Sequence, residues 1–282
     1  MNAKTLLLDS LNTRWDKYKA ELKTCRHEFS EEAVHDFRVA ARRLLSSLDL
    51  LRAVMQEPRI QKMRRILKDQ LDELDDLRDI QALLADISET IHDAPVLQPF
   101  QEYLQGKEKK LLRTARKEIK SLKIASLSKR IQKLKQIIEV SKQDNLELSL
   151  FSAVDEAYAI VNQRYALVDP SQPATIHRLR IAFKKFRYMI EAIHPILQNL
   201  PVDYLKRMHD YQASMGDIQD MEVALQLLTD FGELAPASYH PEPVRSYYKE
   251  RHALALSRYI EDKGEVITFW RNAPDQPFPQ EK

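Results

Sequence analysis

The amino-acid sequence predicts an all-α protein made of two four-helix-bundle repeats related by internal duplication. Glycine occurs only four times in 282 residues, whereas Leu, Ala, Lys, Glu, Gln and Arg fill long stretches, a composition typical of helices. Apolar residues recur at intervals of three and four residues, which is the helical period. Three segments of the first half return in the second half, in the same order and at an almost constant spacing, which indicates a repeated helical unit.

Four helical regions are expected in the first half, at residues 4–26, 30–55, 59–90 and 98–142, the last interrupted near 123–128. Ser30 is predicted to cap the second region, because its hydroxyl can accept a hydrogen bond from a free backbone N–H. Glu31 and Glu32 follow at the positive end of the helix dipole. Pro58 and Pro95 mark the next breaks.

The second half is expected to repeat this layout, with helices at residues 148–167, 174–198 and 201–231 and a last one ending near 270. We place the two repeats at residues 1–143 and 144–271. The tail at 272–282 is polar and rich in proline, so we expect it to be disordered.

The motif H-x-x-R-φ-x-x-B-B, where φ is apolar and B is basic, occurs once in each half, within 34–51 and within 176–193. The two copies lie 142 residues apart and match position by position: His35 with His177, Arg38 with Arg180, Arg42 with Lys184, and Arg43 with Lys185. A single copy is weak evidence for a site, but a matched pair is specific. Two homologous units usually pack about a pseudo-two-fold axis, which would turn the two motif helices toward each other.

Each motif helix is predicted to carry a row of cations beside its buried face. At about 100° per residue, His35, Arg38 and Arg42 fall within about 60° of one another, and the apolar residues of the motif lie on the other side of the helix. Lysine and arginine on a helix most often form a solvated face. Because the pattern recurs at the same helical phase, we interpret the rows as a site for a polyanion, in which Arg takes two phosphate oxygens and Lys acts as a point charge.

Two further segments repeat, L-D-D-L-R-D-I-Q-A-L-L with M-G-D-I-Q-D-M-E-V-A-L and K-E-K-K-L-L with K-E-R-H-A-L. They superpose two pairs of carboxylates, Asp76 on Asp217 and Asp79 on Asp220. We expect these carboxylates to hold Arg or Lys side chains in position; the alternative is a constellation for metal–phosphate chemistry. Superposed cations that could extend the lining of the site are Arg65, Lys68, Lys206, His209, Lys109, Lys110, Arg251 and His252.

The paired motifs, the L-D-D-L-R-D and M-G-D-I-Q-D segments and the duplicated helical layout resemble CHAD domains, the conserved histidine α-helical domains. That resemblance covers nearly the whole chain and implies a basic central cavity that binds inorganic polyphosphate. It also implies targeting to polyphosphate granules or modulation of polyphosphate-metabolising enzymes. Two positions depart from the family pattern: Leu45 replaces a frequent Arg, and Asp75 replaces a usual Gly. The residues that it assigns to the polyphosphate site are His35, Arg38, Arg42, Arg43, His177, Arg180, Lys184, Lys185 and Arg187.

The composition of the chain and the motifs that it lacks exclude several functional classes of protein. The net charge is only +2, so polyanion binding must come from local clusters of cations. A lone Cys25 excludes a disulfide framework and cysteine-based zinc sites. We find no signal peptide, no apolar run near the roughly 18 residues that a membrane helix needs, and no motif for nucleotide, metal or serine chemistry. A cytoplasmic protein without metal or cofactor is therefore expected.

Three questions stay open at this stage. Non-catalytic polyphosphate binding competes with nucleic-acid binding and with an enzymatic role in polyphosphate processing or histidine phosphotransfer. His35 and His177 are interpreted as phosphate donors, but structural bonding, metal ligation and phosphoryl acceptance are alternatives. Residues 107–142 hold 13 Lys or Arg against three Glu, which is either a solvated surface or a second polyanion surface.

Overall fold

The structure, a computed structural model, describes residues 2–55, 57–141, 146–197, 200–236, 239–271 and 275–276. These residues form helices and no strand. Three short 3-10 helices lie at Pro95–Leu97, His194–Ile196 and Lys263–Thr268. The α-helices of the described residues are α1 (Ala3–His27), α2 (Glu31–Val54), α3 (Pro58–Asp72), α4 (Asp75–Thr90), α5 (Gln98–Ser121), α6 (Ile124–Val140), α7 (Leu146–Ala166), α8 (Pro173–Ile193), α9 (Tyr204–Leu234) and α10 (Glu242–Asp262).

The all-α prediction is confirmed, and several local features agree with the sequence. Ser30 caps α2, its Oγ accepting a hydrogen bond from Ala33 N at 3.1 Å. The interruption expected near 123–128 lies between Ser121 and Ile124, where α5 ends and α6 begins. The region predicted at 59–90 is instead two helices, α3 and α4, whereas its counterpart in the second half is the single helix α9.

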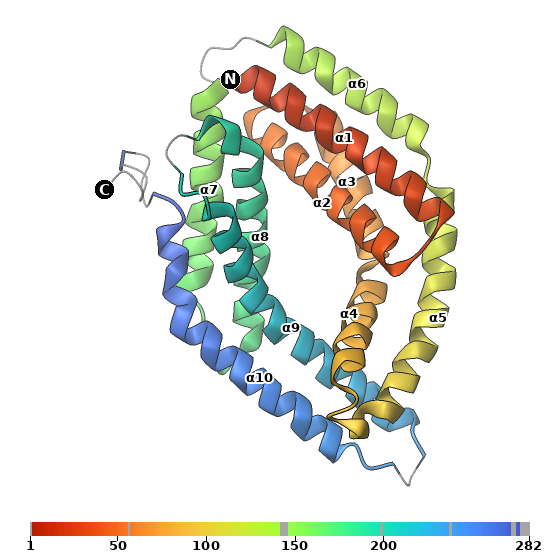
Figure 1. Ribbon diagram of the computed structural model, residues 1–282. Helices are drawn as coiled ribbons and strands as arrows, with labels where there is room; N and C mark the ends of the chain where they lie inside the picture. Colours follow the sequence, from red (N-terminus) through yellow and green to blue (C-terminus); the bar gives the residue numbers. More distant parts are fainter. Residues whose placement is uncertain are drawn as a thin grey trace.

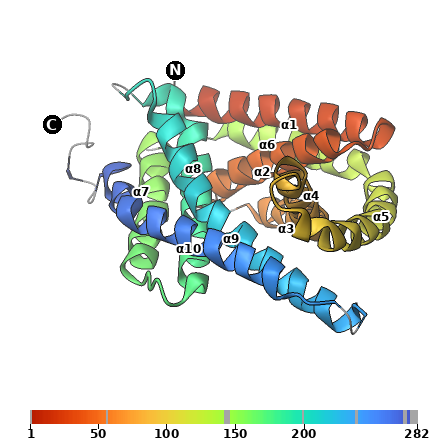
Figure 2. The same ribbon diagram turned by 60° about the horizontal axis from the view of Figure 1, so that its bottom comes forward.

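Helices of the two halves pack directly on each other. In Figure 1, α1, α2, α3 and α6 lie together at one end, and α4, α5, α9 and α10 meet at the other end. Helix α2 contacts α7 and α8 of the second half as well as α1 and α3, and α4 contacts α9. Helices α9 and α10 run side by side in Figures 1 and 2. The motif helices α2 and α8 are therefore held against each other.

The buried apolar side chains form two clusters, and each cluster draws on both halves. The larger one joins α1, α2, α3 and α6 to α7, α8 and the first part of α9. The smaller one joins α4 and α5 to the later part of α9 and the start of α10. The predicted repeat boundary near 144 and most of the predicted disordered tail at 272–282 lie outside the described residues. The internal duplication stays a prediction.

Candidate anion-binding cleft

The two motif helices cross at residues that the sequence had superposed. Ser46 of α2 donates from Oγ to the backbone carbonyl of Tyr188 of α8 at 3.1 Å, and these residues are 142 positions apart. Both are buried. The contact joins two residues that the sequence alignment of the repeats pairs with each other.

Lys184 is the point at which the two cationic rows meet. It lies one helical turn before the crossing, and the charges of Arg42, Arg180 and Arg38 act on it. Burial and these three guanidinium groups lower the pKa of Lys184 to about 6, against the opposing effect of Asp75. A lysine surrounded in this way lacks enough negative charge nearby to keep its proton at neutral pH.

A pocket of about 240 Å³ opens beside Lys184, between α2, the end of α3, the start of α4, and α8. Its lining is mixed in charge, with four cations and three carboxylates. Asp49 is bound to Arg64 at 2.5 Å, and Asp75 is bound to arginines of α2. The lining residues are Arg42, Leu45, Ser46, Asp49, Lys68, Leu71, Asp72, Asp75, Ile181, Lys184, Lys185 and Tyr188.

Arg38 is held inside the protein. Its side chain is only 2% exposed, and it donates to the Leu71 carbonyl at 3.0 Å and to Asp75 Oδ1 at 2.5 Å. Leu71 lies in the last turn of α3, and its carbonyl also accepts a backbone hydrogen bond from Leu74 N at 3.0 Å. The break between α3 and α4 thus provides both groups that bind Arg38, and Arg42 shares Asp75 at 3.4 Å. Arg38 positions the cleft and holds its carboxylate.

Arg180, the predicted equivalent of Arg38, has different surroundings. Its guanidinium lies against Gly216 of α9, where a Cβ would come within 3.4 Å of Nη2. Its Nε is buried and has no hydrogen-bond partner in the described part of the chain. Burial lowers the pKa of Arg180, although the nearby Asp220 raises it. Gly216 occupies the position that aligns with Asp75. Arg38 therefore has a carboxylate at this position, whereas Arg180 has a glycine without a side chain.

The family assignment follows from comparison with known proteins. The sequence model of the CHAD domain matches residues 10–229. The chain belongs to the CHAD domain family. The crystal structure of the CHAD domain from the plant Ricinus communis has the same fold, with a TM-score of 0.67, 19% sequence identity, and coverage of 95% of this chain and 90% of that chain. None of the curated proteins compared with the chain matches it.

Arg78 of this CHAD domain lies near the cationic rows, although the sequence analysis did not single it out. It extends from α4 and donates from Nη1 to both Asp79 and Asp220, each at 3.0 Å. Its charge acts on both Arg42 and Arg180. Its counterpart in the alignment is Gln219, so comparing the two repeats gave no basic pair at this position. The sequence feature that could have drawn attention to Arg78 is its place within the L-D-D-L-R-D segment.

The four repeated carboxylates separate into two kinds. Asp79 and Asp220 hold Arg78 across the α4–α9 contact. Asp76 and Asp217 are exposed residues. The carboxyl group of Asp217 is nevertheless partly desolvated by its neighbours, and this desolvation together with the charge of Asp220 raises its pKa. The described residues contain no group of three or more potential ligands that could hold a metal ion.

The two motif histidines are not equivalent. His35 is exposed in the second turn of α2. His177 is partly buried, and its Nδ1 has no hydrogen-bond partner among the described residues. An enclosed polar atom without a partner is uncommon in a folded protein, so His177 has a nitrogen free for a ligand.

Of the nine residues predicted to line the site, Arg42, Lys184 and Lys185 line the pocket, whereas six lie outside its lining: His35, Arg38, Arg43, His177, Arg180 and Arg187. Arg187 is buried, with Nε donating to Gln212 at 3.0 Å and Nη1 at 2.9 Å from Glu191. Arg43 is half exposed, and its Nε lies 3.8 Å from the same Glu191. Both positions were taken from the motif, which does not show that Glu191 lies between them.

Of the additional lining candidates, only Lys68 contributes to the pocket. Lys206 and His209 are exposed and share Asp210 at 2.5 and 3.5 Å. Arg251 binds Asp86 of α4 through both terminal nitrogens, and His252 lies 4.0 Å from Glu222. Three of the candidates, Arg65, Lys109 and Lys110, are exposed on α3 and α5.

None of the described helices is long and apolar enough to cross a membrane.

Proposed function

We propose that this CHAD domain binds inorganic polyphosphate, without altering it chemically, in the cleft between α2 and α8. The observation that carries the proposal is the surroundings of Lys184 beside the pocket, where burial and guanidinium groups from both motif helices lower its pKa to about 6. A bound chain of phosphates would supply the missing negative charge. Membership of the CHAD family supports this ligand class.

The available donors suit an extended polyanion. Arg42 can take two phosphate oxygens with its planar guanidinium, while Lys68, Lys184 and Lys185 act as point charges. Such contacts require neither bases nor sugars. Affinity should therefore fall steeply with added salt, because binding releases the counterions of the polymer.

A competition experiment at fixed salt concentration tests which polyanion the cleft prefers. We expect long-chain polyphosphate to displace a labelled polyphosphate from the protein at far lower phosphate concentration than RNA or single-stranded DNA does. Arg180→Gln should weaken binding, whereas Arg178→Gln, which removes an exposed charge two residues away on the same helix, should not. Equal competition by nucleic acid, or equal effects of the two substitutions, would refute the proposal.

The absence of catalysis is part of the proposal and needs its own test. The protein is incubated with polyphosphate in the presence and absence of divalent metal, and both released phosphate and phosphorylated histidine are measured. Release above the rate of a heat-denatured sample would make the cleft an active site. We further propose that the protein acts in the cytoplasm at polyphosphate granules or on enzymes of polyphosphate metabolism, which co-localisation with stained granules would examine.

A further inference from the structure

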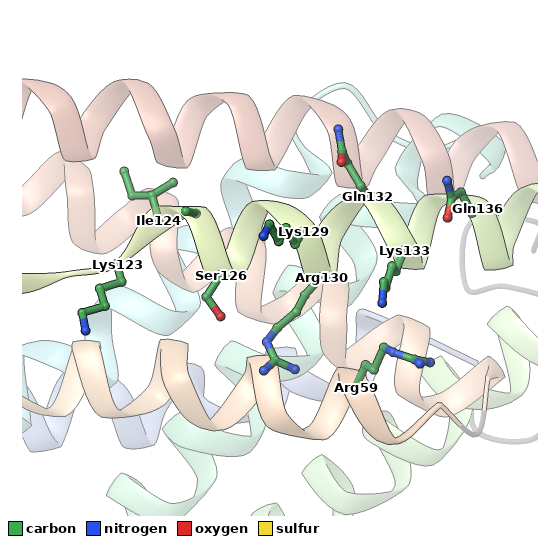
Figure 3. Close-up of a pocket in the computed structure, with 10 residues that line it drawn as sticks. Arg59, Lys123, Ile124, Ser126, Lys129, Arg130, Gln132, Lys133 and Gln136 are labelled. Atoms are coloured by element: carbon green, nitrogen blue, oxygen red, sulfur yellow. The ribbon is translucent and has the colours of Figure 1, made fainter.

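A second cavity, lined by basic residues, lies between α3 and α6. It has a volume of about 870 Å³, more than three times that of the α2–α8 pocket. Figure 3 shows Arg59 of α3 reaching toward Lys133, and Arg130 pointing from α6 toward α3. The residues that line this α3–α6 groove are Arg59, Lys123, Ile124, Ala125, Ser126, Lys129, Arg130, Gln132, Lys133 and Gln136.

The packing of α6 determines which of its side chains face the groove. Its buried residues Leu127, Ile131, Leu134 and Ile138 form one stripe, and α6 uses it to pack against α1 and α3. At about 100° per residue, Ser126, Arg130 and Lys133 fall on one edge of that stripe, within about 60° of one another. From Ser126 to Lys133 this edge is about 10 Å long, and it faces α3 (Figure 3).

The groove differs from an ordinary solvated face in its charge. Its lining contains five cations and no carboxylate. Arg59 is bound to Glu57 at 2.8 Å, but the other four cations have no ion pair within the described residues. Arg130 also has a buried Nε with no acceptor in that part of the chain. The α2–α8 pocket, by contrast, has three carboxylates in its lining.

We propose that the α3–α6 groove is a second binding site for phosphate polymers, independent of the α2–α8 cleft. The identity of the ligand rests on the proposed function, whereas the location rests on the lining of the groove. Arg59 at the groove and Lys68 at the cleft both belong to α3, and their nine-residue separation spans about 14 Å of helix. Lys62 and Arg65 lie between them, exposed and without ion pairs among the described residues.

This arrangement predicts how binding depends on chain length. Tripolyphosphate occupies the two sites separately, so two molecules bind per chain. A long polyphosphate occupies both sites at once, and the second contact then forms at high effective concentration. Long chains therefore bind more tightly than either site alone explains.

The test compares three variants of the full chain by titration calorimetry with tripolyphosphate and with long-chain polyphosphate. The groove variant is Lys129→Gln/Arg130→Gln/Lys133→Gln, and the cleft variant is Arg180→Gln/Lys184→Gln. The charge-matched control is Arg113→Gln/Lys117→Gln/Lys120→Gln, three exposed cations of α5 outside both linings. Circular dichroism confirms that each variant is folded.

The groove variant should bind one tripolyphosphate instead of two and should lose at least about tenfold in affinity for long chains, while the control retains wild-type stoichiometry. A groove variant that behaves like the control overturns the second site and leaves the cleft intact. If the cleft variant binds like the wild type while the groove variant loses all binding, the proposed function of the cleft fails and the groove is the site. A wild-type protein that binds neither probe overturns both.

Discussion

Protonation of Lys184 should control the affinity of the cleft for polyphosphate. In the free protein, burial and the neighbouring Arg42, Arg180 and Arg38 lower its pKa to about 6 from an ordinary 10.5. A phosphate chain favours the charged amine, so binding takes up a proton. Affinity therefore rises as the pH falls toward 6 and levels off below that value.

The size of the effect follows from the fraction of Lys184 that is charged before binding. With a pKa of about 6, about half of the amines are charged at pH 6, about 9% at pH 7 and about 1% at pH 8. If only the charged form binds, the apparent Kd is inversely proportional to this fraction. Binding should then be about fivefold weaker at pH 7 and about fiftyfold weaker at pH 8 than at pH 6.

The assay measures Kd for tripolyphosphate by calorimetry between pH 6 and 8.5 at constant ionic strength, in the groove variant so that one site is observed. Lys184→Arg is the matched variant, because a guanidinium stays charged throughout this range, and its pH profile should be nearly flat. A wild-type profile without slope would refute the reasoning. A slope that persists in Lys184→Arg would show that the titrating group is not Lys184.

The stability of the free protein should change with pH in the opposite sense. Because the folded state lowers the pKa of Lys184, the native protein binds fewer protons than the unfolded chain between pH 6 and about 10. Its stability therefore increases as the pH rises through that window. The melting temperature of the free wild type should rise from pH 6 to 8 more than that of Lys184→Met, and identical trends in the two proteins would contradict this.

Three further substitutions test the cleft. Arg38→Ala should destabilise the protein by about 1–3 kcal/mol in urea unfolding, because the Leu71 carbonyl and Asp75 both lose the guanidinium that they bind; an unchanged midpoint would contradict the structural role. Asp75→Asn removes the carboxylate that competes with phosphate for arginine, so polyphosphate affinity at pH 6 should rise several-fold, and a loss would show that the carboxylate instead organises the site. Gly216→Asp should place a carboxylate against Arg180 and lower affinity, with unchanged binding counting against Arg180 as a ligand.

The all-α class and most helices could be predicted from the sequence because they depend on local periodicity and on capping and breaking residues. The break between α3 and α4 could not, since L-D-E-L-D-D-L contains neither proline nor glycine. The contacts at the break are tertiary: Arg38 of α2 binds the buried Leu71 carbonyl and Asp75 there. A pairing between residues more than 30 positions apart leaves no periodic signal.

The candidate site could be predicted only in part. The motif paired Arg42 with Lys184, 142 positions apart, and both residues line the same pocket. It did not show that Glu191 binds Arg187, or that Asp75 binds Arg38. Helical phase gives the direction of a side chain, but the partner comes from another helix.

A crystal structure of the protein with bound polyphosphate tests the central claim most directly. We predict phosphate oxygens within about 3.2 Å of both Arg42 of α2 and Lys184 of α8, so that one chain joins the two motif helices. Electron density for the polymer that touches neither helix would contradict the account.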